Sequence, residues 1–189
     1  MADPGGGARP HGTVPRVRLV QLELAALRAL ADGDLDAANR SSPVSLTEAF
    51  RDPRWRRVWA RRADQVAADP ATAAWVTGVI WDDEQRVAVG RAGFHAPPDE
   101  HGMVEVGYAV DPAHQRRGYG RAALELLLAR AAGEPGVRVV RATISPGNTA
   151  SRRLVEQYGF VEVGEQLDDE DGLEIVYEVD AAAVAHPST

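Results

Sequence analysis

The chain is 189 residues long, which suffices for one domain with a substantial buried core. Its 28 Asp and Glu residues outnumber its 21 Lys and Arg residues, so general binding to nucleic acid or to an anionic membrane is not expected. The sequence has no cysteine, which excludes disulfide bonds, thiolate nucleophiles and cysteine-ligated zinc.

Both ends of the sequence are predicted to be tails. Residues 1–14 are dominated by Gly, Pro and Ala and lack the continuous apolar stretch of a secretory signal. No apolar run approaches the roughly 20 residues that are needed to cross a bilayer. We therefore expect a cytoplasmic protein in which a single domain over residues 15–180 lies between a flexible N-terminal tail, 1–14, and a C-terminal tail, 181–189.

The first half of this domain mixes strand and helix patterns. Runs rich in β-branched residues predict strands, and apolar residues at helical spacing predict helices. The second helix is interrupted at Asp52-Pro53, and a polar turn separates the last two strands. The predicted elements are a strand over 17–22, helices over 24–35 and 46–66, and strands over 73–81 and 86–95.

The second half predicts a strand over 103–110, a helix over 119–132, a strand over 137–144, a helix over 148–158, and a hairpin of strands over 160–167 and 173–179. The order strand, helix, strand predicts a parallel crossover. The fold class is therefore α/β, or α+β under stricter naming. We expect a mixed, mostly antiparallel central sheet with one parallel crossover and helices on both faces.

A run of six arginines lies between residues 51 and 62 of this acidic chain. The favoured interpretation is a solvated helix face whose arginine stems cover apolar surface. The alternative is a patch for an acidic substrate or partner. A nucleic-acid interaction through this run is disfavoured by the acidic total charge.

The most informative stretch has the order strand, turn, helix and contains two glycines, Gly118 and Gly120. Glycines let the backbone approach a ligand closely, and the start of the following helix presents N–H groups without intrahelical partners. Such a turn attracts anions, and nearby arginines add charge. The glycine spacing alone fits a plain turn equally well. The predicted anion site comprises Gln115, Arg116, Arg117, Gly118, Tyr119, Gly120 and Arg121.

Three motifs in this order resemble the GNAT acetyltransferase superfamily. They are Gln115-x-x-Gly118-x-Gly120 after Val110-Asp111-Pro112, then Asn148-x-x-Ser151, and finally Gly159-Phe160. The resemblance is closest in pattern to the Rim-type ribosomal-protein N-terminal acetyltransferases. It implies an acetyl-CoA-dependent enzyme that transfers an acetyl group directly to a primary amine, of a small molecule or a protein N-terminus. It also implies a splayed central strand pair.

The same resemblance assigns residues to coenzyme A. The turn from Gln115 to Arg121 would wrap the pyrophosphate, and the strand that contains Ala109 would run beside the pantetheine arm. The N–H of Val110 would face the thioester carbonyl, in the gap between the strands. Asn148 and Ser151 are implied to contact the cosubstrate as well, although Asn148 is an equally good helix N-cap.

The resemblance also places the catalytic groups at Glu105 and Ser151. Glu105 is the expected base, and either burial would raise its pKa or a water chain would carry the proton. Ser151 is the expected proton donor to the sulfur, because the position of the family's usual tyrosine is Val155 here. Tyr158 is a poorer alternative.

The remaining alternatives concern metals, partners and activity. The five histidines show no paired metal spacing, so no metal site is expected. A non-catalytic module that binds or senses acyl-CoA with the same fold is the alternative to an enzyme. The amine acceptor is the only partner expected, without nucleic acid or membrane, and a homodimer would be unsurprising.

Overall fold

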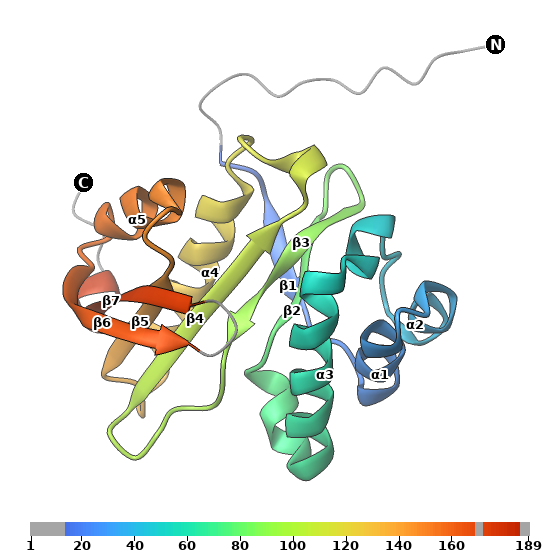
Figure 1. Cartoon of the computed structure of the whole chain (residues 1–189), viewed down its shortest axis with the longest axis horizontal. Coiled ribbons are helices and arrows are strands. Elements are labelled where there is room, and N and C mark those ends of the chain that lie inside the picture. Colours follow the sequence, from blue (N-terminus) through green and yellow to red (C-terminus); the bar gives the residue numbers. More distant parts are fainter. Residues whose placement is uncertain (1–13, 169–171, 186–189) are drawn as a thin grey trace.

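A computed structural model describes residues 14–168 and 172–185 (Figure 1). Seven strands form one sheet in the order β1-β2-β3-β4-β5-β7-β6. The strands are β1 (Val17–Val20), β2 (Gly78–Asp82), β3 (Val87–Phe94), β4 (Met103–Val110), β5 (Val139–Ile144), β6 (Val161–Asp168) and β7 (Gly172–Asp180). The helices are α1 (Leu24–Asp32), α2 (Leu35–Ser41), α3 (Pro53–Ala68), α4 (Tyr119–Gly133) and α5 (Thr149–Glu156).

One parallel pair joins two antiparallel halves of the sheet. β4 pairs with β5 in parallel, and every other neighbouring pair of strands is antiparallel. The β4–β5 ladder ends at the pair Glu105–Arg141, although the strands continue to Val110 and Ile144. The central strands therefore separate over their C-terminal ends. This confirms the mixed sheet with one crossover and a splayed pair.

Helices cover both faces of the sheet, as Figure 1 shows. On one face, Leu124 and Leu127 of α4 are fully buried in a core shared with Val104 and Val140. On the other face, Phe50 stacks on Trp59 of α3 at 6.0 Å, in a second core with α1. In α1 and α3 the apolar residues at helical spacing, among them Leu27, Leu30, Trp55 and Trp59, are buried as predicted. The predicted α/β class with helices on both faces is confirmed.

Three predicted elements differ clearly at their ends. The helix predicted over 46–66 is a 3₁₀ helix, Glu48–Arg51, followed by α3, and the break lies at the predicted interruption, Asp52-Pro53. The helix predicted over 24–35 breaks at Gly33, which has φ +78° and caps α1, while Asp34 accepts from Ala37 N–H to start α2. The strand predicted over 73–81 begins only at Gly78. Its first residues belong to a 3₁₀ helix, Pro70–Ala74, because proline favours a first helical position and Asp69 caps that turn.

The C-terminal elements follow the prediction. α5 ends before Gly159, which has φ +81°, and β6 and β7 form the expected hairpin. A short 3₁₀ helix, Ala183–Ala185, follows β7 and contacts α4. The limits of the domain and of its tails stay predictions. Within the described residues, no helix is both long and apolar enough to span a membrane.

Candidate active site

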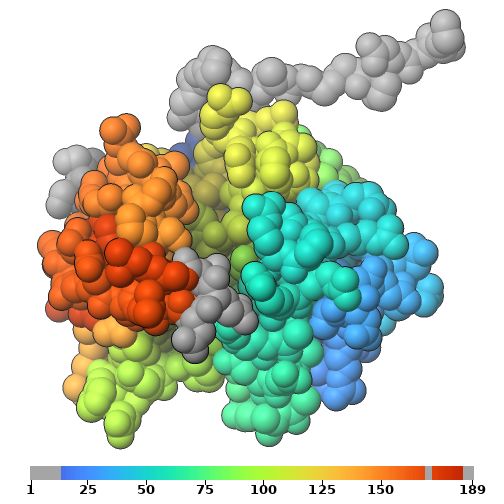
Figure 2. Space-filling view, in the orientation of Figure 1, coloured from blue at the N-terminus to red at the C-terminus, as the bar shows by residue number. Residues whose placement is uncertain are grey.

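A cleft of about 1220 Å3 lies where β4 and β5 separate. Its lining comes from α3 and β3 on one side, and from the turn before α4, the end of β5 and α5 on the other. Figure 2 shows this face of the molecule hollowed between α3 and the α5 region. The cleft therefore reaches elements that cover opposite faces of the sheet.

The turn before α4 forms one wall of the cleft. Asp111 accepts from Ala113 N–H at 2.9 Å, and the chain then turns through positive φ angles at Arg116 and Gly118. The first backbone hydrogen bond of α4 runs from Ala122 N–H to Gly118 O. The amides that precede it have no intrahelical acceptor, and the helix dipole makes this end of α4 positive. The geometry suits a bound diphosphate.

The edge of β4 opens on the gap. Successive residues of a strand direct their N–H groups to opposite sides, and Asp111 N–H donates to Val89 O of β3 at 2.9 Å. The N–H groups of Tyr108 and Val110 therefore point away from β3, toward β5, beyond the point where the β4–β5 ladder ends. Such an edge can pair with an extended ligand or polarise a carbonyl.

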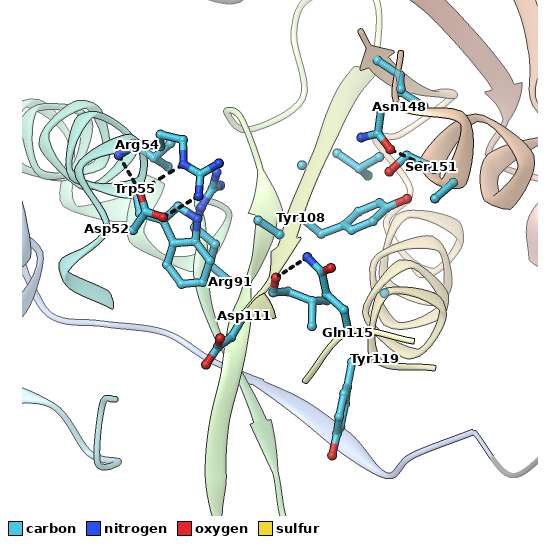
Figure 3. A pocket seen from close by; sticks show the side chains of 18 of the residues that line it. Asp52, Arg54, Trp55, Arg91, Tyr108, Asp111, Gln115, Tyr119, Asn148 and Ser151 are labelled. Carbon is cyan, nitrogen blue, oxygen red and sulfur yellow. Dashed lines mark hydrogen bonds and ion pairs between the residues drawn. The ribbon is translucent and has the colours of Figure 1, made fainter. Parts of the chain in front are cut away.

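Residues of α5 and β4 meet on the far wall. Asn148 caps α5 by accepting from Ser151 N–H at 3.2 Å, as its N-cap pattern predicts. Tyr108 extends from β4 toward Ser151 (Figure 3), and its buried hydroxyl makes no hydrogen bond of normal geometry within the described part of the chain. Burial raises the pKa of Tyr108, against the effect of the Ser151 hydroxyl, so the phenol is protonated at neutral pH.

Glu105 lies at the foot of the gap. Its Oε1 accepts from Thr143 Oγ1 at 2.6 Å and lies 3.1 Å from His95 Nδ1. Burial alone would raise the Glu105 pKa, but the hydrogen bonds from His95 and Thr143 and the charge of Arg141 outweigh it, and the pKa is lowered. Of the two alternatives expected for Glu105, a raised pKa is wrong, because three cationic or hydrogen-bonding partners outweigh burial, and a water chain stays a prediction.

The opposite wall carries positive charge from α3 and β3. The cleft is lined there by Arg54, Arg57, Arg61, Arg62 and Arg91, together with the acidic Glu48 and Asp52, and Glu174 of β7 lines it as well. Arg54 pairs with Asp52 at 2.7 Å, and Arg91 lies over the ring of Trp55 (Figure 3). The arginine run is therefore more than a solvated helix face. Arg51 and Arg56 do fit that favoured interpretation, since they bind Glu48 and the end of α1.

Comparison with known proteins identifies the family of this chain. A family model described as "Acetyltransferase (GNAT) domain" matches residues 16–161. The chain belongs to the GNAT acetyltransferase family. This confirms the resemblance that the three motifs carried.

Individual relatives match this GNAT chain over shorter stretches. It is 36% identical to N-acetyltransferase YjdG of Bacillus subtilis over 88 residues, 47% of this chain and 51% of that protein. It is 44% identical to L-2,4-diaminobutyric acid acetyltransferase of Streptomyces avermitilis over 62 residues, 33% of this chain and 35% of that protein. The matches thus span about half of the first relative and about a third of the second.

The solved structure of Mycobacterium smegmatis RimJ in complex with CoA-disulfide shares the fold. Its TM-score is 0.60 at 17% identity, and the superposition covers 90% of this chain and 89% of that one. At this identity the likeness shows a common fold. The expected likeness to Rim-type proteins is confirmed at the level of architecture.

The GNAT cleft gathers most residues of the predicted cofactor site. The residues among its lining are Ala109, Val110, Gln115, Arg116, Gly118, Tyr119, Gly120, Asn148 and Ser151. Arg117 and Arg121 do not line it, and Arg121 instead binds Gln157 and the Tyr158 hydroxyl. Tyr119 turns its ring into the core, where its hydroxyl donates to Asp82 at 2.6 Å, so it can serve a ligand only through its backbone.

Two groups at the cleft escaped the sequence analysis. The sequence places Tyr108 in the predicted strand over 103–110 and His95 at the end of the predicted strand over 86–95, without indicating a role for either. Neither lies in a motif, and only the register of β3 and β4 brings His95 to Glu105. Tyr158, the poorer candidate for proton donor, hydrogen-bonds Glu125 and Arg121 outside the cleft lining, and burial raises its pKa to about 12. Within residues 14–168 and 172–185, no cluster of His, Asp and Glu could hold a metal ion.

Proposed function

We propose that this chain is an acetyl-CoA-dependent N-acetyltransferase that transfers the acetyl group directly to a primary amine, with residues 15–180 as its acetyltransferase domain. One observation carries the proposal. A single cleft connects the amide-rich turn before α4 with the open edge of β4 and with the polar wall of α3. An anionic cosubstrate and an amine can thus approach the gap from opposite sides of the sheet.

The turn supplies the cosubstrate site. The amides at the start of α4, with the side chains of Gln115 and Arg116, hold the diphosphate of coenzyme A. Gly118 and Gly120 keep that backbone accessible. Asn148 and Ala109 border the path of the pantetheine arm toward the gap. Acetyl-CoA supplies an activated thioester there.

The gap supplies the reaction site. The N–H groups of Tyr108 and Val110 point into it and stabilise negative charge on the acetyl oxygen. Ser151, or Tyr108 beside it, is a hydroxyl donor for the departing sulfur. Glu105 is one of the residues that together remove a proton from the acceptor ammonium. Direct transfer to a neutral amine needs neither a metal nor a covalent enzyme intermediate.

The wall of the cleft formed by α3 and β3, here called the acceptor wall, favours an acceptor that carries both a positive and a negative charge. Both arginines and carboxylates line it, and a named relative acts on diaminobutyric acid. An amino acid with a side-chain amine has a carboxylate for the arginines and an ammonium for the carboxylates.

The test is an acceptor screen with acetyl-CoA that measures released thiol. The screen includes one matched pair, 2,4-diaminobutyrate and 1,3-diaminopropane, which differ by one carboxylate. Peptides with an N-terminal alanine represent protein N-termini. We expect thiol release that depends on the acceptor and is faster for 2,4-diaminobutyrate than for 1,3-diaminopropane. Tight binding of coenzyme A with no thiol release for any amine would instead favour a non-catalytic acyl-CoA-binding module.

A further inference from the structure

The imidazole of His95 lies between Glu105 and the cleft. Its Nδ1 is 3.1 Å from Glu105 Oε1, and its side chain is 39% exposed against 19% for the Glu105 side chain. His95 is among the residues that line the cleft, and Glu105 is not. An acceptor bound in the cleft therefore meets the imidazole before it meets the carboxylate.

Both partners of this pair are fixed by further hydrogen bonds. His95 N–H donates to Glu105 O at 2.8 Å, which holds the end of β3 to β4. The His95 carbonyl accepts from Arg62 and from Gln65 of α3, each at 2.9 Å. Thr143 of β5 donates to Glu105 Oε1 at 2.6 Å. Three elements thus hold the imidazole and the carboxylate in one geometry.

Gly107 makes room for the ring. A Cβ atom at this position would lie 2.7 Å from His95 Nε2, closer than van der Waals contact allows. The Nε2 end of the ring therefore rests against β4 at Gly107. It lies next to the strand edge where the N–H of Tyr108 opens on the gap. That is where a proton acceptor for an attacking amine has to be.

The carboxylate selects the tautomer of the ring. A hydrogen bond from Nδ1–H to Glu105 leaves the lone pair on Nε2. The charged groups next to the pair are Arg62 of α3, which interacts with the Glu105 charge, and Arg141 of β5. Arg62 in turn lies near the charges of Arg61 and Arg91. Arg141 is itself paired with Glu178 at 2.6 Å. Nε2 is thus the ring atom that can accept a proton from the acceptor.

We propose that His95 is the general base of the acetyl transfer and that Glu105 is a positioning residue that orients it. This inference rests on the proposed function. The acceptor ammonium gives one proton to Nε2 and attacks as the neutral amine. The carbon–nitrogen bond forms and the carbon–sulfur bond breaks. The amine nitrogen releases its second proton, the thiolate takes up one, and the proton on Nε2 leaves to solvent.

The pH dependence of turnover tests the base. We expect His95→Gln to lower kcat by about 10²- to 10⁴-fold and to abolish the acidic limb of the pH–rate profile. The matched control is His101→Gln, because His101 lies in a loop with 81% of its side chain exposed and does not line the cleft. Equal melting temperatures and equal coenzyme A affinities for the two variants exclude a folding defect. A His95→Gln enzyme within about threefold of wild type, with its acidic limb intact, overturns the proposal.

Glu105→Gln separates the two roles. If Glu105 only positions the ring, this variant loses about 10- to 100-fold in kcat and keeps an acidic limb. If Glu105 is itself the base, the limb disappears in this variant and persists in His95→Gln. That second pattern refutes the assignment to His95.

A measurement that does not depend on turnover distinguishes a failure of the His95 assignment from a failure of the proposed acetyltransferase function. The ¹⁵N chemical shifts of the His95 ring, assigned by their loss in His95→Gln, should show the Nδ1–H tautomer at alkaline pH, and Glu105→Gln should reduce that preference. An Nε2–H tautomer in wild type contradicts the inference even if the enzyme is active. Wild type that transfers no acetyl group contradicts the proposed function, whatever the tautomer is.

Discussion

The two halves of the cleft are built in different ways. The half that we propose for coenzyme A is formed mainly by the segment between Tyr108 and Gly120, with one helix cap at Asn148. The acceptor half uses side chains that four separate elements bring together, among them His95, Glu105 and Thr143. A backbone site requires glycines at fixed spacing and is readable in the sequence. A site of side chains from several strands leaves no such pattern.

Gly107→Ala should disturb the acceptor half of the cleft without affecting the coenzyme half. The new methyl group would lie 2.7 Å from His95 Nε2, and the imidazole can rotate away without moving the backbone. We expect kcat to fall by about 10²-fold, the lower end of the contribution of a general base. Calorimetry should find the coenzyme A affinity unchanged. A variant with normal kcat would mean that the position of the ring does not matter for turnover.

Gly118→Val should damage the other half. Gly118 has φ +84°, which a β-branched residue adopts only with strain of about 1–3 kcal/mol. An altered turn presents its amides poorly, so we expect Kd for coenzyme A to rise by roughly 10- to 100-fold. The control is Gly136→Val, because a Cβ there meets no atom within 4 Å and Gly136 is remote from the cleft. Equal affinities for the two variants would contradict the assigned diphosphate site.

Ser151→Ala and Tyr108→Phe should have smaller effects that separate the two hydroxyls. Each removes one donor next to the path of the sulfur, and the other remains. We expect each single variant to lose about 3- to 10-fold in kcat and the double variant to lose more than the product of the two. Strictly multiplicative losses would show that the hydroxyls act independently.

The smallest expected effect concerns stability in acid. Because the Glu105 pKa is lower in the folded protein than its ordinary value of 4.5, its contribution to stability is present above about pH 4.5 and is lost as the pH falls further. The melting temperature of wild type should therefore fall more steeply below pH 4.5 than that of Glu105→Gln. Other carboxylates titrate in both proteins and cancel in the comparison. Parallel curves would mean that the ion pair contributes nothing.

Much of the fold could be predicted from periodicity and turn residues. β4 was predicted with its observed bounds, and the start of α4 at Tyr119 follows from the two glycines. Ala73 and Ala74 were assigned to a strand because alanine fits either structure, and the capping by Asp69 decided for a 3₁₀ turn. Local capping chemistry competes with hydrophobic pattern in such segments.

The candidate site was predictable only where it is local. Gln115, Gly118, Gly120 and Asn148 occur in motifs whose spacing reflects one turn and one helix start. The contact of His95 with Glu105 depends on the pairing of β3 with β4, and the lowered pKa of Glu105 depends on Thr143 of a third strand. Tertiary register of this kind is not encoded in a single segment.

The short parallel ladder between β4 and β5 has a mechanical consequence. The ladder between the two antiparallel halves of the sheet has three residue pairs, from Met103–Val139 to Glu105–Arg141. Besides it, Gly102 O accepts from the Arg138 and Val139 N–H groups, and Thr143 donates to Glu105. A pantetheine chain lying between the separated parts of β4 and β5 would form hydrogen bonds in place of the absent β4–β5 pairs. If coenzyme A binds there as proposed, amide hydrogens on either side of the ladder should exchange more slowly in its presence, because the ligand would extend the sheet.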